Sequence, residues 1–152
     1  ARFFSQGNRM TYDESVEIGT IAKYLADQSH QFTQYSGVRP NGVSLIIAGI
    51  DQKGESIYVT DPSGTYVQYA AVAIGAGSDD VNDFLEKHYK PDMSIDDVSS
   101  LAIAAINLKN EQKDRIDDIK MAKVTTETKV FEKVSESDLK NYSQNVSKFS
   151  TE

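Results

Sequence analysis

A short apolar run at residues 43–50 constrains the fold more than any other part of this sequence. It reads Val-Ser-Leu-Ile-Ile-Ala-Gly-Ile, is rich in β-branched residues, and has the length of a strand buried on both faces. Asp51-Gln-Lys-Gly54 follows with the composition of a hairpin turn, in which Gly54 is able to adopt a positive φ. Residues 55–60 are predicted to be the return strand, so the sequence indicates an antiparallel hairpin.

The antiparallel pattern continues after this hairpin. Residues 61–64, Asp-Pro-Ser-Gly, suit a type I turn, because Asp is favoured first, Pro fixes φ at the second place and Gly is favoured last. Residues 65–69 and 70–74 are predicted to extend the meander. Two more short strands are predicted at 119–124 and 129–134. This order of strands excludes a βαβ series.

Helices are predicted on both sides of these strands. Thr11 and Glu14 have the spacing of a capping box, which predicts a helix that begins near Tyr12, and residues 1–4 resemble the end of an earlier helix stopped near Gly7. The expected buried stripe of the capped helix is Ile18, Ile21, Ala22, Leu25 and Ala26.

Three later helices are predicted to begin after Ser78, Ser94 and Ser135. For the first of them the expected buried side is Val81, Phe84, Leu85 and His88, and for the second it is Ile95, Val98, Leu101, Ala102, Ala105 and Ile106. Residues 107–118 are polar and are predicted to be a solvated connection. The predicted fold class is α+β, in a single domain over residues 1–152.

Composition excludes several classes of protein. The 152 residues carry 16 Lys and Arg against 23 Asp and Glu, a net charge of −7, and this acidity argues against nucleic acid or anionic membrane as a partner. The absence of Cys excludes a disulfide scaffold, a thiolate zinc site and a cysteine nucleophile. No apolar segment approaches the length of a bilayer span and no secretory signal is visible, which predicts a soluble intracellular domain.

Candidate chemical sites are weak. His30 and His88 have no Asp or Glu at ligand spacing, so no metal site is predicted. The acidic pairs at 79–80 and 96–97 fall in the first turns of predicted helices, where negative charge complements the helix dipole. Gly75-Ala-Gly77-Ser78 superficially resembles a phosphate loop but lacks the third Gly and the Lys-Ser/Thr step. No catalytic residue, metal or cofactor is predicted.

One segment, residues 31–45, differs from ordinary packing sequence. Pro40 favours an extended Arg39, and Gly37 and Gly42 permit a sharp turn between a helix and the apolar strand. From the residues alone, a plain connecting loop is the favoured interpretation and a functional loop is the alternative.

Several blocks of sequence together resemble a known family. They are Thr-Gln-Tyr-Ser-Gly-Val-Arg-Pro-Asn-Gly-Val-Ser-Leu at 33–45, Ala-Gly-Ile-Asp at 48–51, Thr-Asp-Pro-Ser-Gly-Thr at 60–65, Ala-Ile-Gly at 73–75 and Phe-Leu-Glu-Lys-His-Tyr at 84–89. In order and spacing they are similar to the α subunits of the proteasome core particle, of the archaeal type. The resemblance extends over nearly the whole chain.

The resemblance implies a four-layer αββα sandwich of the N-terminal nucleophile hydrolase type, with two antiparallel sheets between helical layers. It also implies a non-catalytic, structural subunit of a seven-membered α ring, since the threonine nucleophile of this protease complex belongs to β subunits and Ala1 has no hydroxyl. The implied partners are other α subunits, β subunits, a regulatory ATPase or other activator, and unfolded polypeptide in transit.

In the family, the turn that matches 35–41 surrounds the axial entrance for substrates. The entrance residues implied here are Tyr35, Gly37, Val38, Arg39, Pro40 and Asn41, and the structural turns are Gly42 with Asp61, Pro62, Ser63 and Gly64. Asn41 departs from the family, which usually has an aromatic residue there, so the apolar character of the rim is open.

Family members also have a gating tail, a first helix and several strands before the region that corresponds to Ala1, which implies that this chain is the C-terminal two-thirds of such a subunit. The implied location is the cytoplasm, and also the nucleus in a eukaryote. Two alternatives remain open: a threonine-type peptide hydrolase of the same superfamily, and a stand-alone interaction domain with this fold.

Overall fold

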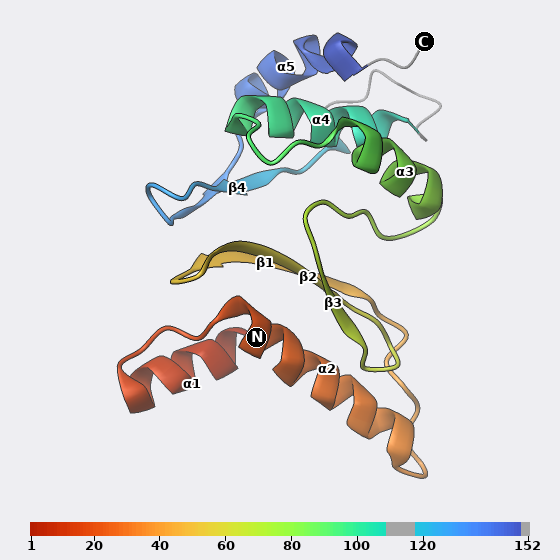
Figure 1. Cartoon of the computed structure of the whole chain (residues 1–152). Helices are drawn as coiled ribbons and strands as arrows, with labels where there is room; N and C mark the ends of the chain where they lie inside the picture. Colours follow the sequence, from red (N-terminus) through yellow and green to blue (C-terminus); the bar gives the residue numbers. More distant parts are fainter. Residues whose placement is uncertain (109–117, 150–152) are drawn as a thin grey trace. The chain divides into compact units, whose positions relative to one another are not determined.

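The computed structural model describes residues 1–108 and 118–149. The chain divides into two compact units, residues 1–70 and residues 71–152, which are described one at a time (Figure 1). Both units combine helices with an antiparallel sheet, which confirms the α+β class predicted from the sequence.

The first unit contains a three-stranded antiparallel sheet and two helices. Its elements are α1 (Arg2–Tyr12), α2 (Ile18–Gln34), β1 (Leu45–Asp51), β2 (Gly54–Thr60) and β3 (Tyr66–Tyr69). The strand order is β1-β2-β3, so the predicted meander is confirmed up to residue 69. The prediction that 70–74 continues as strand is wrong, because the chain leaves the sheet after Tyr69.

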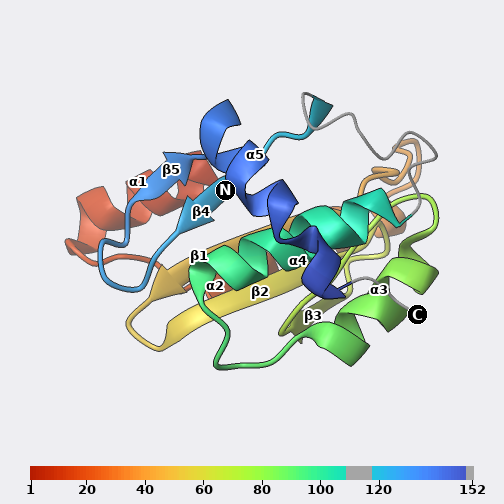
Figure 2. The same ribbon diagram turned by 90° about the horizontal axis from the view of Figure 1, so that it is seen from above.

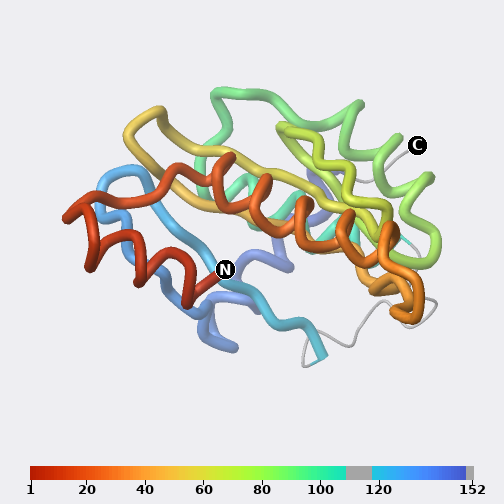
Figure 3. Tube along the Cα trace, turned by 90° about the horizontal axis from the view of Figure 1, so that it is seen from below, coloured from red at the N-terminus to blue at the C-terminus, as the bar shows by residue number. Residues whose placement is uncertain are grey.

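Helix α2 lies along one face of this sheet (Figure 3). The approach is close because two glycines stand at the contact. A Cβ on Gly49 of β1 would come within 2.5 Å of Ile18 Cδ1, and a Cβ on Gly19 of α2 would come within 3.0 Å of the Tyr58 hydroxyl. The glycines therefore leave room for the Ile18 and Tyr58 side chains between the helix and the sheet. Ala22 and Ala26 are fully buried, as the apolar stripe predicted.

The opposite face of the sheet is apolar too. Register and alternation place on it Ile46, Ala48, Ile50, Ile57, Val59, Val67 and Tyr69. Ile46 and Val67 are nevertheless exposed, as is Leu45 on the α2 face. The prediction that residues 43–50 are buried on both faces is therefore wrong, although the strand itself is confirmed.

The predicted capping box at Thr11 is wrong. The first helix does not stop near Gly7 but continues to Tyr12, and the Thr11 hydroxyl donates to the main-chain oxygen of Gly7 at 2.8 Å inside that helix. Asp13, at φ 55°, ends it. Because a helix tolerates one Gly at a cost of only about 1 kcal/mol, Gly7 is a weak stop signal. The Phe4 ring stacks on the Tyr24 ring of α2 with centroids 4.1 Å apart.

The second unit is organised around one central helix. Its elements are α3 (Ser78–His88), α4 (Ile95–Asn107), β4 (Ala122–Val124), β5 (Phe131–Lys133), α5 (Glu136–Gln144) and the 3₁₀ helix η2 (Val146–Phe149). Helix α4 contacts α3, α5 and η2 (Figure 2). Strands β4 and β5 form an antiparallel hairpin, so both strands predicted in this region are confirmed in shorter form.

The caps predicted for the last two helices are present. The hydroxyls of Ser94 and Ser135 accept hydrogen bonds from the main-chain N–H groups of Asp97 and Asp138. The buried side of α4 differs from the prediction, since Ile95 and Ile106 are exposed. The buried residues of α4 are Ser99, Ser100, Leu101, Ile103, Ala104 and Ala105. This set spans more than one side because α4 packs on α3 and α5 together.

The α3 prediction holds for Phe84 and Leu85, which are buried, whereas Val81 and His88 are half-buried. The connection predicted at 107–118 lies largely outside the described residues, which resume at Asp118. Within residues 1–108 and 118–149, no helix combines the length and the apolar character needed to cross a bilayer.

Candidate functional site

The segment singled out from the sequence is the connection from α2 to β1. Helix α2 ends at Gln34, and the Tyr35 N–H donates to the Gln31 oxygen at 3.3 Å before the chain turns. Gly37 has φ +89°, a conformation that favours glycine. Gly42 does not have a positive φ, so its presence is not explained by the backbone. We call residues 35–41 the entrance turn, after the role that the family resemblance implies for them.

The entrance turn is exposed along its whole length. Tyr35 retains 66% of its surface and Val38 retains 48%. A Cβ on Gly37 or Gly42 would meet no atom of the described residues within 4 Å. Both side chains are therefore accessible to other molecules.

The second segment from the sequence, residues 61–64, forms a tight turn between β2 and β3. The Gly64 N–H donates to the Asp61 main-chain oxygen at 3.1 Å. Asp61 Oδ1 accepts from the Ser63 N–H at 2.8 Å, the Ser63 hydroxyl at 2.5 Å and the Thr65 N–H at 3.2 Å. These bonds lower the pKa of Asp61, the Ser63 hydroxyl being the largest cause.

This turn packs against α2. A Cβ built on Gly64 would stand 2.6 Å from His30 Cβ and 2.8 Å from the Ala26 main-chain oxygen, and Gly64 itself has φ +91°. His30 Nδ1 lies 3.3 Å from the Ser63 main-chain oxygen, to which it donates when it carries a proton. The structure thus brings the second segment to the end of the helix that leads into the entrance turn.

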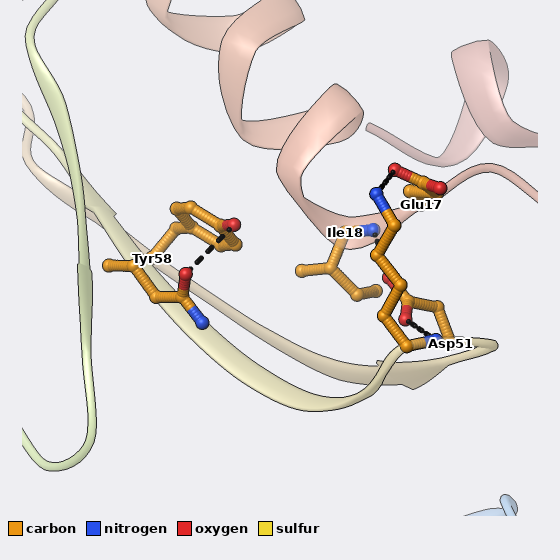
Figure 4. Close-up of polar contacts among 6 residues, drawn as sticks. Glu17, Ile18, Asp51 and Tyr58 are labelled. Atoms are coloured by element: carbon orange, nitrogen blue, oxygen red, sulfur yellow. Dashed lines mark hydrogen bonds and ion pairs between the residues drawn. The ribbon is translucent and has the colours of Figure 1, made fainter.

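The opposite end of α2 is held by the β1–β2 turn (Figure 4). Asp51 Oδ2 accepts from the Ile18 N–H at 2.9 Å and its Oδ1 accepts from the Lys53 N–H at 2.7 Å. The Ile18 bond is the largest cause of the lowered pKa of Asp51. Lys53 Nζ also pairs with Glu17 at 2.7 Å. Both ends of α2 are therefore fixed to turns of the sheet.

Two of these contacts have no signal in the sequence. The spacing around His30 argues only against a metal site, and Asp51 is predicted only as the first residue of a hairpin turn. The Asp51 contact joins residues 33 positions apart, and the same separation holds for His30 and Ser63. The spacing of residue types within a few positions does not predict a contact between residues this far apart.

The second unit has a cavity of about 490 Å³ beside the β4–β5 hairpin and α5. It is lined by Ile119, Lys120, Met121, Ala122, Phe131, Lys133, Val134, Glu136 and Leu139. Its lining contains one carboxylate and no His, which is not a constellation for acid–base or nucleophilic chemistry. Across residues 1–108 and 118–149, no cluster of three or more His, Asp or Glu side chains is placed to hold a metal ion.

Comparison with known proteins gives a consistent result. The profile of the family described as "Proteasome subunit" matches residues 1–124. The chain is 43% identical over 142 residues to the proteasome subunit alpha of Archaeoglobus fulgidus, covering 93% of this chain and 57% of that protein. It is 41% identical over 146 residues to the proteasome subunit alpha of Saccharolobus islandicus (95% and 61%), and 39% identical to that of Saccharolobus solfataricus (95% and 61%). The chain thus spans about three fifths of the length of these relatives.

Proposed function

The chain belongs to the proteasome subunit family, and from that premise we propose that it is a non-catalytic α subunit of the proteasome core particle. In this proposal it is a member of a heptameric ring whose centre is the axial entrance for substrates. The named relatives are α subunits, which supports the α type over the β type.

The observation that carries the proposal is the exposed entrance turn on a fixed support. Tyr35 and Val38 project from the end of α2, and α2 is tied to the sheet at both ends by Asp51 and by the contact between His30 and Ser63. A ring of such turns excludes folded domains by size and admits an extended chain. The rim needs fixed geometry and no reactive group.

Assembly with further subunits is part of the same proposal, and the family membership supports it. The proposed partners are neighbouring α subunits, the β ring on which the α ring docks, and a regulatory ATPase or other activator. Substrates would be unfolded polypeptides in ATP-dependent degradation, and the proposed location is the cytoplasm.

The test is reconstitution of the complete protein that carries this chain with the β subunits of its own genome. Native mass spectrometry should give heptameric rings and their stacks with β rings. Hydrolysis of fluorogenic peptides should require the β subunits. Turnover by this protein alone would overturn the non-catalytic assignment and favour the threonine-type hydrolase. A monomer at high concentration, with or without β subunits, would overturn the ring.

A further inference from the structure

The two ends of the entrance turn are tied to the same short turn of the sheet. On the N-terminal side, His30 lies one helical turn before Gln34 and contacts Ser63 and Gly64. On the C-terminal side, β1 begins at Leu45, which pairs with Thr60, the residue before Asp61. We call His30 with residues 61–64 the brace.

We propose that the brace positions the entrance turn, and so sets how well unfolded polypeptide passes the entrance. This inference rests on the proposed function for its effect on substrates. The inference also has a structural part: His30 and the turn at 61–64 fix the place of residues 35–41. This part depends only on contacts within the first unit.

The entrance turn has few other supports. Residues 33–46 are all exposed, and open space surrounds Gly37 and Gly42 on the side where a Cβ would stand. A segment with little side-chain packing belongs to the locally least stable part of a fold, so the contacts at its two ends are what limits the positions that it samples. The N-terminal end is additionally tied to the helix by the Thr33 hydroxyl, which donates to the His30 oxygen at 2.6 Å. A shift of His30 is therefore passed to Gln34 and Tyr35.

The brace is itself rigid and close-fitting. Asp61 Oδ1 accepts hydrogen bonds from the N–H groups of Ser63 and Thr65, and the residue that precedes Asp61, Thr60, is only 2% exposed. The missing side chain of Gly64 lets the turn touch the His30 and Ala26 backbone directly. A side chain at Gly64 has no room, because the atoms that it would meet are main chain or Cβ and not the end of a flexible side chain.

The experiment measures the place of the entrance turn directly. These 152 residues contain no Cys, so once any Cys elsewhere in the complete protein is replaced by Ser, the pair Val38→Cys and Gln52→Cys accepts two spin labels, one on the entrance turn and one on the β1–β2 turn. Electron–electron distances are measured in the complete protein, with labelled copies diluted by unlabelled ones so that both labels are in one copy. This measurement does not depend on ring formation.

The brace variants are His30→Leu, which removes the donor, and His30→Gln, which keeps an N–H group. Loss of one exposed neutral hydrogen bond should lower the population of the braced position about twofold to fivefold, so His30→Leu should broaden or shift the distance distribution. His30→Gln should restore part of the native distribution. Gly64→Ala should shift it further, whereas Gly75→Ala, which replaces a glycine of the second unit that has φ +112° and open space, should not.

The functional readout is the ratio of unfolded-protein degradation to short-peptide hydrolysis by assembled particles. His30→Leu should change this ratio by about twofold or more and His30→Gln should return it toward the wild type. An unchanged distance distribution in His30→Leu overturns the brace. A shifted distribution with an unchanged ratio in intact particles overturns its effect on substrates. Absence of rings in the wild type overturns the proposed function and leaves the distance measurement to decide the structural part.

Discussion

The carboxylate of Asp51 accepts a hydrogen bond from the main-chain N–H of Ile18 at 2.9 Å, across 33 positions of sequence. Ile18 is the first residue of α2, and the N-cap residue Glu17 supplies no side-chain cap of its own. The β1–β2 turn therefore provides the cap for a helix that is distant in sequence. This places a negative charge at the positive end of the helix dipole.

Asp51→Asn tests this cap through pH. The pKa of Asp51 is lowered, so its carboxylate contributes stability above the unfolded-state pKa of about 3.9 and loses that contribution as pH falls through the folded-state pKa. At pH 7 the variant should be about 0.5–1 kcal/mol less stable, since this group is largely solvated. In urea denaturation the difference from wild type should begin to narrow below about pH 4 and disappear only below the lowered folded-state pKa. A difference in the free energy of unfolding between wild type and variant that stays constant with pH would contradict the cap.

Gly64→Ala should be the most destabilising of the glycine replacements in the first unit. The added Cβ meets His30 Cβ and the Ala26 oxygen, and the backbone at φ +91° disfavours a side chain. We expect a loss of about 2–4 kcal/mol in the free energy of unfolding. Gly54→Ala is the matched control, because it has a positive φ and no close atoms; it should lose about 1 kcal/mol. Equal losses for the two variants would show that the contact with α2 is unimportant.

Gly49→Ala should be coupled to Ile18. The new Cβ would stand 2.5 Å from Ile18 Cδ1, the flexible end of that side chain, so the expected loss is about 1 kcal/mol. Ile18→Val removes this methyl group, and Gly49→Ala should cost less in that background. A double-mutant cycle measured by denaturation should give a coupling of about 0.5–1 kcal/mol. Additive effects would indicate that the helix does not press on β1 here.

Ser94→Ala and Ser135→Ala should each lose about 1 kcal/mol of stability, because each removes the acceptor of an N-cap hydrogen bond in the second unit. Ser94→Thr and Ser135→Thr keep the hydroxyl and are the controls. Thermal denaturation of the four variants under one set of conditions makes the comparison. Loss as large in the Thr variants as in the Ala variants would argue against capping.

Val38→Cys coupled to a bulky polymer maleimide should slow degradation of unfolded protein by assembled particles at least about tenfold, because the polymer would fill the proposed entrance. The substitution alone should have little effect. Lys87→Cys, exposed on α3, is the matched labelling control, and any reactive Cys elsewhere in the particle is first replaced by Ser. Equal rates for the two labelled particles would remove residues 35–41 from the path of the substrate.

Local patterns in the sequence predict much of this fold. The strands at 45–60, the turns at Gly54 and Gly64, and the caps at Ser94 and Ser135 each depend on neighbours within a few residues. The capping box predicted at Thr11 is wrong because the same spacing of Thr and Glu also occurs inside a helix. A contact between residues distant in sequence, the stack of Phe4 on Tyr24, favours continuation of α1.

The candidate site also contains some features that the local sequence predicts and others that it does not. The glycine at Gly37 and the extended Arg39-Pro40 step indicate a turn, and the family resemblance indicates its role. The supports of the turn are not visible in the sequence, because His30 and Asp51 act on residues 33 positions away. The exposure of Ile95 and Ile106 was equally hidden, since α4 has several neighbours and periodicity reports only one side.

The loop closed by Asp61 also has a consequence for the time course of folding. Its hydrogen bonds lie within five consecutive residues, 61–65, so it can close before any distant part of the chain has arrived. Once closed, it starts the pairing of β2 with β3 at Thr60 and Tyr66, and a slip by one residue would turn every side chain to the wrong face. Closure of this loop is therefore sufficient to set the register of β2 with β3 without any contact from α2.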